Sequence, residues 1–284
     1  MRRAWRRSEK MIDFTRCRNA QVVERMTEDD YLQKQGFEVR GKAEYFMHRN
    51  FAHRGLHDMD RSIPENSLMA FAAAVGEGYG IELDVQLSKD GQVVVFHDDT
   101  LNRVCGVDGR VDAYDYDELK EFSLLGTIQH IPPFSEVLEL IGSGDSPLIV
   151  ELKSGPRNSE LCEKTYNILQ QYQGKYCIES FNPFIVRWFK QNVPEVFRGI
   201  LAASKEEYMP TYSPFVAKIL SNCTLSFLCQ PDFIAYQNVE RPKHVLRMRE
   251  KGTLLFAWTS RVPDVDQAQN DAVIFENYRP SLLF

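Results

Sequence analysis

Acidic residues interrupt an apolar segment of the chain at a spacing that could bind a cation. In IELDV, residues 81–85, Glu82 and Asp84 alternate with apolar residues. Side chains alternate along a strand, so both carboxylates would point to one face, with Cα atoms roughly 7 Å apart. In a partly dry site their repulsion would raise one pKa unless a cation lay between them. Taken alone, the segment also fits a strand at the rim of a sheet with two solvated acids.

A second segment, LIVELK at 148–153, repeats this arrangement. Glu151 and Lys153 fall on the face opposite the apolar residues. Glu82, Asp84 and Glu151 together would form an all-oxygen site, which suits Ca²⁺ or Mg²⁺ better than zinc. We therefore predict one bound divalent cation, Ca²⁺ or Mg²⁺, with these three carboxylates as its ligands.

Two histidines stand where predicted strands end, His53 in FAHRG and His97 after VVVF. A single histidine at such a position is more often structural. Two that converge with an acidic cluster at the carboxyl ends of strands predict a general acid and a general base, because imidazole titrates near neutrality. Arg54 and Lys153 would then supply the donors that hold a phosphoryl oxygen.

The elements that must position these residues follow a βα alternation. From residue 50 onward, short apolar runs alternate with helix-like stretches, which is typical of a parallel sheet or barrel. We predict a TIM-type (β/α)8 barrel, whose carboxyl-terminal rim is where such folds carry out chemistry. Nine strands are expected, one more than the barrel needs: Phe51–His53, Ile81–Val85, Val93–Phe96, Leu148–Leu152, Tyr176–Glu179, Phe197–Leu201, Phe233–Tyr236, Leu254–Trp258 and Val273–Phe275. Helices are expected at Asn66–Gly76, Tyr116–Phe122, Ser135–Ile141, Ser159–Tyr172, Pro183–Gln191 and Lys243–Lys251.

The barrel is expected to be irregular between the second and third strands. Their connection, from Val85 to Val93, contains the turn residues Lys89, Asp90 and Gly91 and is too short for a crossover helix. Either the two strands pair as a hairpin or the chain returns outside the barrel. One of the nine strands is therefore expected to be an edge or return strand.

Composition argues against a nucleic-acid-binding protein and against a membrane-spanning one. The chain has 284 residues with 34 basic and 40 acidic side chains, a net charge of −6 that gives no electrostatic footprint for nucleic acid. The six cysteines form no C-x-x-C pair, so we interpret them as free thiols. No apolar segment follows the N-terminal arginines, and no window has the length of a transmembrane helix, which favours a cytoplasmic enzyme. Residues 1–45 are charge-rich and are expected to be an extension, followed by one barrel domain at 46–284.

The order and spacing of several short stretches resemble the glycerophosphodiester phosphodiesterase family. The resemblance runs from about residue 51 to 280 and implies a TIM-type barrel that hydrolyses glycerophosphodiesters to sn-glycerol 3-phosphate and an alcohol with the help of a metal. The matching stretches are HRG at 53–55, PENS at 64–67, IELDVQLSKDG at 81–91, VVVFHDDTLNR at 93–103, IP at 131–132, LIVELK at 148–153, ESF at 179–181 and WT at 258–259.

The resemblance also implies roles for single residues. His53 and His97 would be acid and base, Arg54 and Lys153 would bind phosphate, and the metal ligands would be Glu82, Asp84 and Glu151. Pro64 and Asn66 would order the loop after the first strand, with Glu65 as a further candidate member of the site.

The chain departs from the family pattern in two places. The family usually ends its last strand with a Thr-Asp pair before a proline, whereas this chain has FENYRP at 275–280, which leaves Glu276 without a role. The family often has an asparagine shortly after the tryptophan, whereas here Thr259 and Ser260 follow Trp258. Trp258 is predicted to bind substrate, and Phe181 and Tyr278 are further candidates for an aromatic wall or for ordinary core packing.

Other functions fit the same residues. The same chemistry could act on lysophospholipids, as in a lysophospholipase D, which would require an apolar entrance to the site. A barrel that binds phosphorylated ligands without catalysis is a second alternative, although both histidines are present. Water and the glycerol hydroxyl of the substrate are both candidate nucleophiles, and the oligomeric state stays open.

Overall fold

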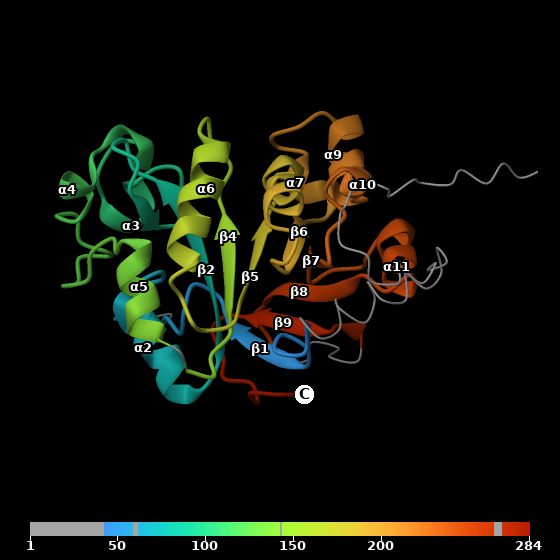
Figure 1. The fold of residues 1–284 in the computed structure, drawn as a ribbon, viewed down its shortest axis with the longest axis horizontal. Helices are drawn as coiled ribbons and strands as arrows, with labels where there is room; N and C mark the ends of the chain where they lie inside the picture. Colours follow the sequence, from blue (N-terminus) through green and yellow to red (C-terminus); the bar gives the residue numbers. More distant parts are fainter. Residues whose placement is uncertain (1–42, 59–61, 143, 264–268) are drawn as a thin grey trace, which may run out of the picture.

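A closed barrel of eight parallel strands forms the centre of the molecule. The computed structural model describes residues 43–58, 62–142, 144–263 and 269–284 (Figure 1). Neighbouring strands pair in the order β1-β2-β4-β5-β6-β7-β8-β9, and β9 pairs back to β1. The strands are β1 (Arg49–Ala52), β2 (Gly80–Leu87), β4 (Leu148–Leu152), β5 (Tyr176–Ser180), β6 (Arg198–Ala202), β7 (Phe233–Gln237), β8 (Leu254–Ser260) and β9 (Ala272–Phe275). The predicted barrel class is confirmed.

The ninth strand lies outside the barrel. β3 (Val93–Val95) pairs antiparallel with the end of β2, with Val85 opposite Val95 and Leu87 opposite Val93. The connection is therefore a hairpin, and its turn contains Gly91 at φ +84°. All nine predicted strands are present, and β3 is the one that the barrel does not need.

Helices cover the barrel and are mostly those predicted. Six predicted helices are present with shifted ends: α2 (Leu68–Glu77), α4 (Tyr116–Leu119), α5 (Phe134–Ile141), α6 (Asn158–Leu169), α7 (Pro183–Asn192) and α11 (Lys243–Glu250). The sequence analysis missed α3 (Asn102–Cys105), α8 (Lys205–Tyr208), α9 (Pro214–Ser221), α10 (Ser226–Cys229) and the 3-10 turn η1 (Val111–Ala113). Figure 1 shows α3 and α4 gathered on one side of the barrel and α9 and α10 on the other. Four-residue helices are too short for a helical period to show.

The interior of the barrel changes from apolar to acidic along its axis. At the amino ends of the strands, Phe51, Phe197, Phe233 and Phe256 pack together, and the last two rings stack with centroids 4.2 Å apart. Towards the carboxyl ends, the inward positions of β2, β4 and β5 carry carboxylates instead. The apolar layer fills one end of the barrel, and the cavity that could take a ligand lies at the acidic end.

The loop and helix after β1 are fixed by short-range contacts. Ser67 caps α2 by accepting a hydrogen bond from the Ala70 amide, and its hydroxyl donates to the Pro64 carbonyl oxygen. Gly55 adopts φ +79°, and a Cβ there would lie 2.8 Å from Ala70. Only glycine lets the chain turn this tightly against α2, and this turn places the two residues before it, His53 and Arg54, at the rim.

A satellite core lies beneath the segment that follows β3. Val94 and Phe96 pack with apolar side chains of the next 35 residues or so, namely Leu101, Val104, Val111, Leu119, Leu124 and Ile131. Val93 and Val95, on the other face of β3, pack into the main core between barrel and helices. β3 therefore joins the satellite core to the barrel.

Three further predictions concern membrane spans, the cysteines and the N-terminal segment. Within the described ranges, none of the helices has the length and apolar character needed to cross a membrane. The five cysteines in the described part are free thiols, as predicted, and Cys17 lies outside it. The predicted extension at residues 1–45 falls almost entirely outside the described residues, so its boundary stays a prediction.

Candidate active site

A cavity of about 360 Å³ opens at the carboxyl ends of the barrel strands. Six of the eight predicted site residues line it: His53, Arg54, Glu82, His97, Glu151 and Trp258. The other two, Asp84 and Lys153, lie directly behind this lining, where the Lys153 Nζ is 2.8 Å from Glu151 Oε1 and 3.2 Å from Asp84 Oδ1. The fold therefore brings all eight side chains to one place.

Three carboxylates form a compact group on the cavity wall. Oxygen atoms of Glu82, Asp84 and Glu151 all lie within 4.8 Å of one another. Asp84 on β2 is in register with Glu151 on β4, and each of the three residues is at most 7% exposed. The alternative of solvated acids at a rim is therefore wrong for this segment.

The electrostatics of this group favour a bound cation. Burial raises the pKa of Glu82 well above its usual value, and the charges of Asp84 and Glu151 add to the effect. Burial alone would also raise the pKa of Asp84, but Lys153, His97 and Arg54 outweigh it and hold that pKa well below its usual value. Negative charge thus exceeds its local compensation. Buried oxygen ligands with excess negative charge fit a hard divalent cation of the Ca²⁺ or Mg²⁺ type.

A fourth carboxylate, which the sequence analysis missed, lines the same wall. Glu179 on β5 pairs in register with Glu151, is 1% exposed, and has an Oε2 atom without a hydrogen-bond partner in the described chain. Burial and the neighbouring Glu151 raise its pKa well above the usual value. The signal was present in the sequence, because YCIES places one acid inside an apolar strand just as LIVELK does.

The two histidines lie in different environments. Burial lowers the pKa of His53 to about 4, so its imidazole is neutral at pH 7. His97 has its Nδ1 atom 2.6 Å from Asp98 Oδ1. That contact holds the proton on Nδ1 and leaves Nε2 as the ring atom that can exchange a proton with a ligand.

β2 also holds the loop that carries His97. The Gln86 side-chain amide donates to the carbonyl oxygens of Phe96 and Asp98, at 2.8 and 2.9 Å. The Phe96 amide donates to the Asp84 carbonyl oxygen at 3.0 Å. The residues on both sides of His97 are thus bonded to the strand that supplies two of the carboxylates, which fixes the histidine relative to them.

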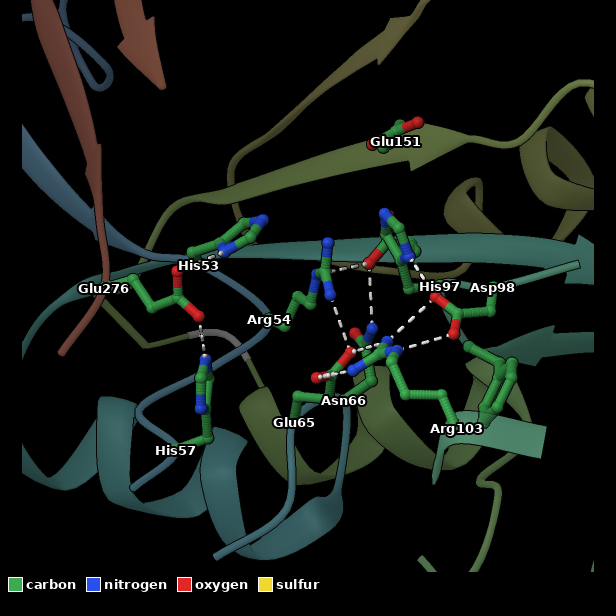
Figure 2. Close-up of polar contacts among 12 residues, drawn as sticks. His53, Arg54, His57, Glu65, Asn66, His97, Asp98, Arg103, Glu151 and Glu276 are labelled. Atoms are coloured by element: carbon green, nitrogen blue, oxygen red, sulfur yellow. Dashed lines mark hydrogen bonds and ion pairs between the residues drawn. The ribbon is translucent and has the colours of Figure 1, made fainter. Parts of the chain in front are cut away.

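An ion-pair network connects the loop after β1 with the loop after β3. Arg54 contacts Glu65 at 2.7 Å, and Arg103 donates to both Glu65 and Asp98 at 2.6–2.8 Å (Figure 2). Burial alone would raise the pKa of Glu65, but the two arginines lower it to about 2. The sequence analysis assigned no role to Arg103, which the structure shows to join the two loops that carry the histidines.

Asn66, predicted only to order this loop, also contacts the acidic group. Its side-chain amide donates to Asp84 Oδ2 at 2.8 Å, and its backbone adopts φ +55°. The amide of Arg54 donates to Glu82 Oε2 at 3.0 Å. The loop after β1 therefore fixes the orientation of two carboxylates.

Comparison with known proteins agrees with this geometry. The model of the glycerophosphoryl diester phosphodiesterase family matches residues 53–276. The chain belongs to this family. It is 36% identical over 160 residues to a glycerophosphodiester phosphodiesterase of Caldanaerobacter subterraneus subsp. tengcongensis, covering 53% of this chain and 65% of that protein. It is 31% identical over 148 residues to a lysophospholipase D of Rattus norvegicus, covering 48% of this chain and 45% of that protein.

Solved structures share the fold. The structure of an Oleispira antarctica phosphodiesterase in complex with the product sn-glycerol-3-phosphate superposes with a TM-score of 0.67 at 25% identity, covering 83% of this chain and 95% of that chain. The matched part of the chain spans somewhat less than two thirds of the length of the bacterial relatives at 35–36% identity, namely 65% and 66%.

Two of the three aromatic residues named as candidates for a wall of the site line the cavity. The Trp258 indole donates to the carbonyl oxygens of Ala202 and Ala235, and Phe181 packs edge-on against it at 5.5 Å. Both rings line the cavity. Tyr278 does not belong to that lining, because its ring packs on Phe275 and its hydroxyl bonds to Ser260. For Tyr278 the contacts favour the other interpretation, ordinary core packing.

The two segments in which the chain departs from the family pattern contact each other. Glu276, after β9, has Oε2 2.8 Å from the Arg261 Nε, and Arg261 follows the WTS stretch that lacks the usual asparagine. The same carboxylate approaches His53 and His57. Neither Glu276 nor His57 had a predicted role.

Proposed function

We propose that this protein is a metal-dependent phosphodiesterase that hydrolyses glycerophosphodiesters to sn-glycerol 3-phosphate and an alcohol. The observation that carries the proposal is the meeting of two histidines, an arginine and a group of buried carboxylates in one cavity. The related Oleispira phosphodiesterase, solved with sn-glycerol-3-phosphate as its product, supports the substrate class. A cytoplasmic location stays a prediction from the sequence.

The carboxylates of Glu82, Asp84 and Glu151 would hold the divalent cation, Ca²⁺ or Mg²⁺, with Glu179 beside them. When bound, the cation neutralises the phosphodiester and stabilises the charge that develops on its oxygens. Arg54 and Lys153 would bind other phosphoryl oxygens through their charged donors. The Trp258 and Phe181 rings would flank the glycerol or alcohol part of the substrate.

Proton transfer would be divided between the histidines. His53 is neutral at pH 7 because burial lowers its pKa, so it can take the proton from the attacking hydroxyl as general base. His97 would donate a proton from its Nε2 to the leaving oxygen as general acid, with its Nδ1 held by the Asp98 carboxylate. Each transfer contributes about 10²- to 10⁴-fold to the rate.

The test is hydrolysis of glycerophosphocholine by the full chain. EDTA is expected to abolish the reaction, and added Ca²⁺ or Mg²⁺ to restore it. His53→Ala and His97→Ala are each expected to lower kcat by more than about 100-fold, whereas His244→Ala, an exposed histidine on α11, serves as the matched control. Full turnover in EDTA, or in either active-site variant, would contradict the proposal. Product release above background excludes the non-catalytic binding barrel.

Lysophospholipids are a second candidate substrate class, because apolar side chains are exposed on a connection that reaches the cavity. The connection between β6 and β7 reaches the cavity at Glu207 and carries Phe215 and Phe227, which are 73% and 67% exposed. Such side chains could admit an acyl chain, and the similar rat protein is a lysophospholipase D. Phe215→Ser should lower turnover of lysophosphatidylcholine but not of glycerophosphocholine. Equal effects on both substrates would remove this candidate.

A further inference from the structure

Two histidines and a glutamate converge beside the active-site cavity without forming hydrogen bonds of ordinary length. His53 Nδ1 lies 3.7 Å from Glu276 Oε2, and His57 Nε2 lies 3.4 Å from Glu276 Oε1. Figure 2 shows the Glu276 carboxylate between the two rings, apart from His97 and Glu151. Both ring nitrogens are buried, and neither has a hydrogen-bond partner among the residues that the structure describes.

The two distances, each to a different oxygen of Glu276, are longer than hydrogen bonds and close to the separation of ligands around one transition-metal ion. A hydrogen bond between ring nitrogen and carboxylate would measure about 2.7–3.2 Å. Zinc binds histidine nitrogen and carboxylate oxygen at about 2.0–2.2 Å, which puts neighbouring ligands of a tetrahedral site roughly 3.3–3.5 Å apart. One donor atom from each of the three residues lies within 4.8 Å of the others.

The backbone fixes this convergence. β1 pairs with β9 so that Ala52 is opposite Phe275, and the His53 amide donates to the Phe275 carbonyl oxygen at 3.0 Å. His53 and Glu276, the next residues of the two strands, are therefore held side by side. The turn at Arg54 and Gly55, both with positive φ, brings His57 back towards them.

We propose that His53, His57 and Glu276 form a second cation site, for Zn²⁺ or a similar transition metal. Two imidazoles and one carboxylate are a common ligand set for zinc, whereas the all-oxygen group of Glu82, Asp84 and Glu151 suits Ca²⁺ or Mg²⁺. A cavity of about 260 Å³, lined by His57 and Glu276 among others, leaves room for a further ligand. The two sites would thus select different ions by donor type.

Occupancy of this site has a consequence that rests on the proposed function. His53 is also the residue to which we assign proton transfer, so zinc at this site would inhibit hydrolysis. The competing explanation for the cluster is that Glu276 only orients His53, with Arg261 balancing its charge. Arg261 is 61% exposed, and the orienting explanation gives His57 no part in binding zinc.

The test is a zinc titration against a chromophoric chelator, using metal-stripped full-length protein in saturating Ca²⁺ to fill the acidic site. The wild type is expected to bind one Zn²⁺ per chain at this site, and His57→Gln to weaken that binding at least tenfold. His244→Gln, an exposed histidine on α11, is the matched control and should leave the affinity unchanged. Thermal unfolding of each variant checks that it is folded. Unchanged zinc affinity in His57→Gln, or no zinc binding by the wild type, would overturn the site.

A second measurement separates this proposal from the proposed function. Zinc should inhibit glycerophosphocholine hydrolysis by the wild type, and His57→Gln should shift the half-inhibiting concentration by the same factor as the affinity, with zinc-free turnover retained. Zinc binding that depends on His57 but does not inhibit would overturn the inhibitory role. Zinc binding that depends on His57, in a protein without hydrolytic activity under any metal, would support the site and contradict the proposed function.

Discussion

Two groups of carboxylates lie at the same end of the barrel but differ in how many positively charged side chains contact each acid. The inner group, Glu82, Asp84, Glu151 and Glu179, shares Lys153 and Arg54 among four acids. In the outer pair, Glu65 contacts Arg54 and Arg103, and Asp98 contacts Arg103 and His97.

Except for Asp84, whose pKa Lys153, His97 and Arg54 lower, the pKa values of the two groups move in opposite directions. Burial raises the pKa of Glu82, Glu151 and Glu179, whereas ion pairs lower that of Glu65 to about 2 and that of Asp98 well below its usual value. The same residue type is therefore destabilising in one group and stabilising in the other. Under the proposed function, an acid in the inner group serves to bind the cation, whereas an acid in the outer pair holds the two loops in place.

The largest expected effect comes from neutralising an inner acid. Glu82→Gln should lower kcat for glycerophosphocholine roughly 10²- to 10³-fold, because a ligand of the cation is lost. In EDTA at pH 7 the same variant should unfold at a higher temperature than the wild type, since its repulsion with Asp84 and Glu151 is removed. Steady-state kinetics and thermal unfolding measure the two effects.

The control for this variant is Glu160→Gln, which changes a surface acid paired with Arg157 and Lys164 and should leave kcat unchanged. A Glu82→Gln protein less stable than the wild type in EDTA would show that the inner group needs no cation to balance it.

A smaller effect is expected from neutralising an outer acid. The folded-state pKa of Glu65 is about 2 against 4.5 for an unperturbed side chain, so its stabilisation is complete above pH 4.5 and is lost as pH falls towards 2. Glu65→Gln should therefore lower the free energy of unfolding by about 2–3 kcal/mol at pH 7 and by much less near pH 2.5. Urea unfolding at several pH values measures this difference, and a pH-independent loss would contradict the charge-based explanation.

The smallest effect is expected at the exposed edge of the outer pair. Arg103 is about half exposed and contacts both Glu65 and Asp98. Solvent screens these contacts, so Arg103→Gln should cost about 1 kcal/mol of stability, and high salt should reduce that cost. A loss as large as that of Glu65→Gln would mean that the outer pair is as well shielded from water as the inner group.

The inner group could be predicted because its acids follow the two-residue period of side chains along a strand. Glu82 and Asp84 stand two positions apart in one apolar strand and so share its inner face, and parallel pairing places Glu151 of the next strand beside Asp84. Glu179 obeys the same rule but was missed, because its strand has no second charged residue at the alternating position, as Lys153 is for Glu151.

The outer network and the cluster of His53, His57 and Glu276 have no such local pattern. Arg103 reaches Glu65 across 38 positions of sequence, and Glu276 meets His57 only because β9 pairs with β1. Such contacts depend on how loops fold back over a closed barrel. α9 was different, since Ser213 followed by Pro214 is a helix start signal that the sequence already contained.

Because β3 lies outside the barrel, His97 is expected to take part in local unfolding more often than His53. His53 directly follows a barrel strand, whereas His97 follows a strand whose outer face is anchored in the satellite core. Segments with their own small core open independently of the rest of a fold. Amide protons around residues 94–131 should therefore exchange with solvent sooner than those of the barrel strands. Under the proposed mechanism, each such opening would displace the general acid His97 while the general base His53 stays in place.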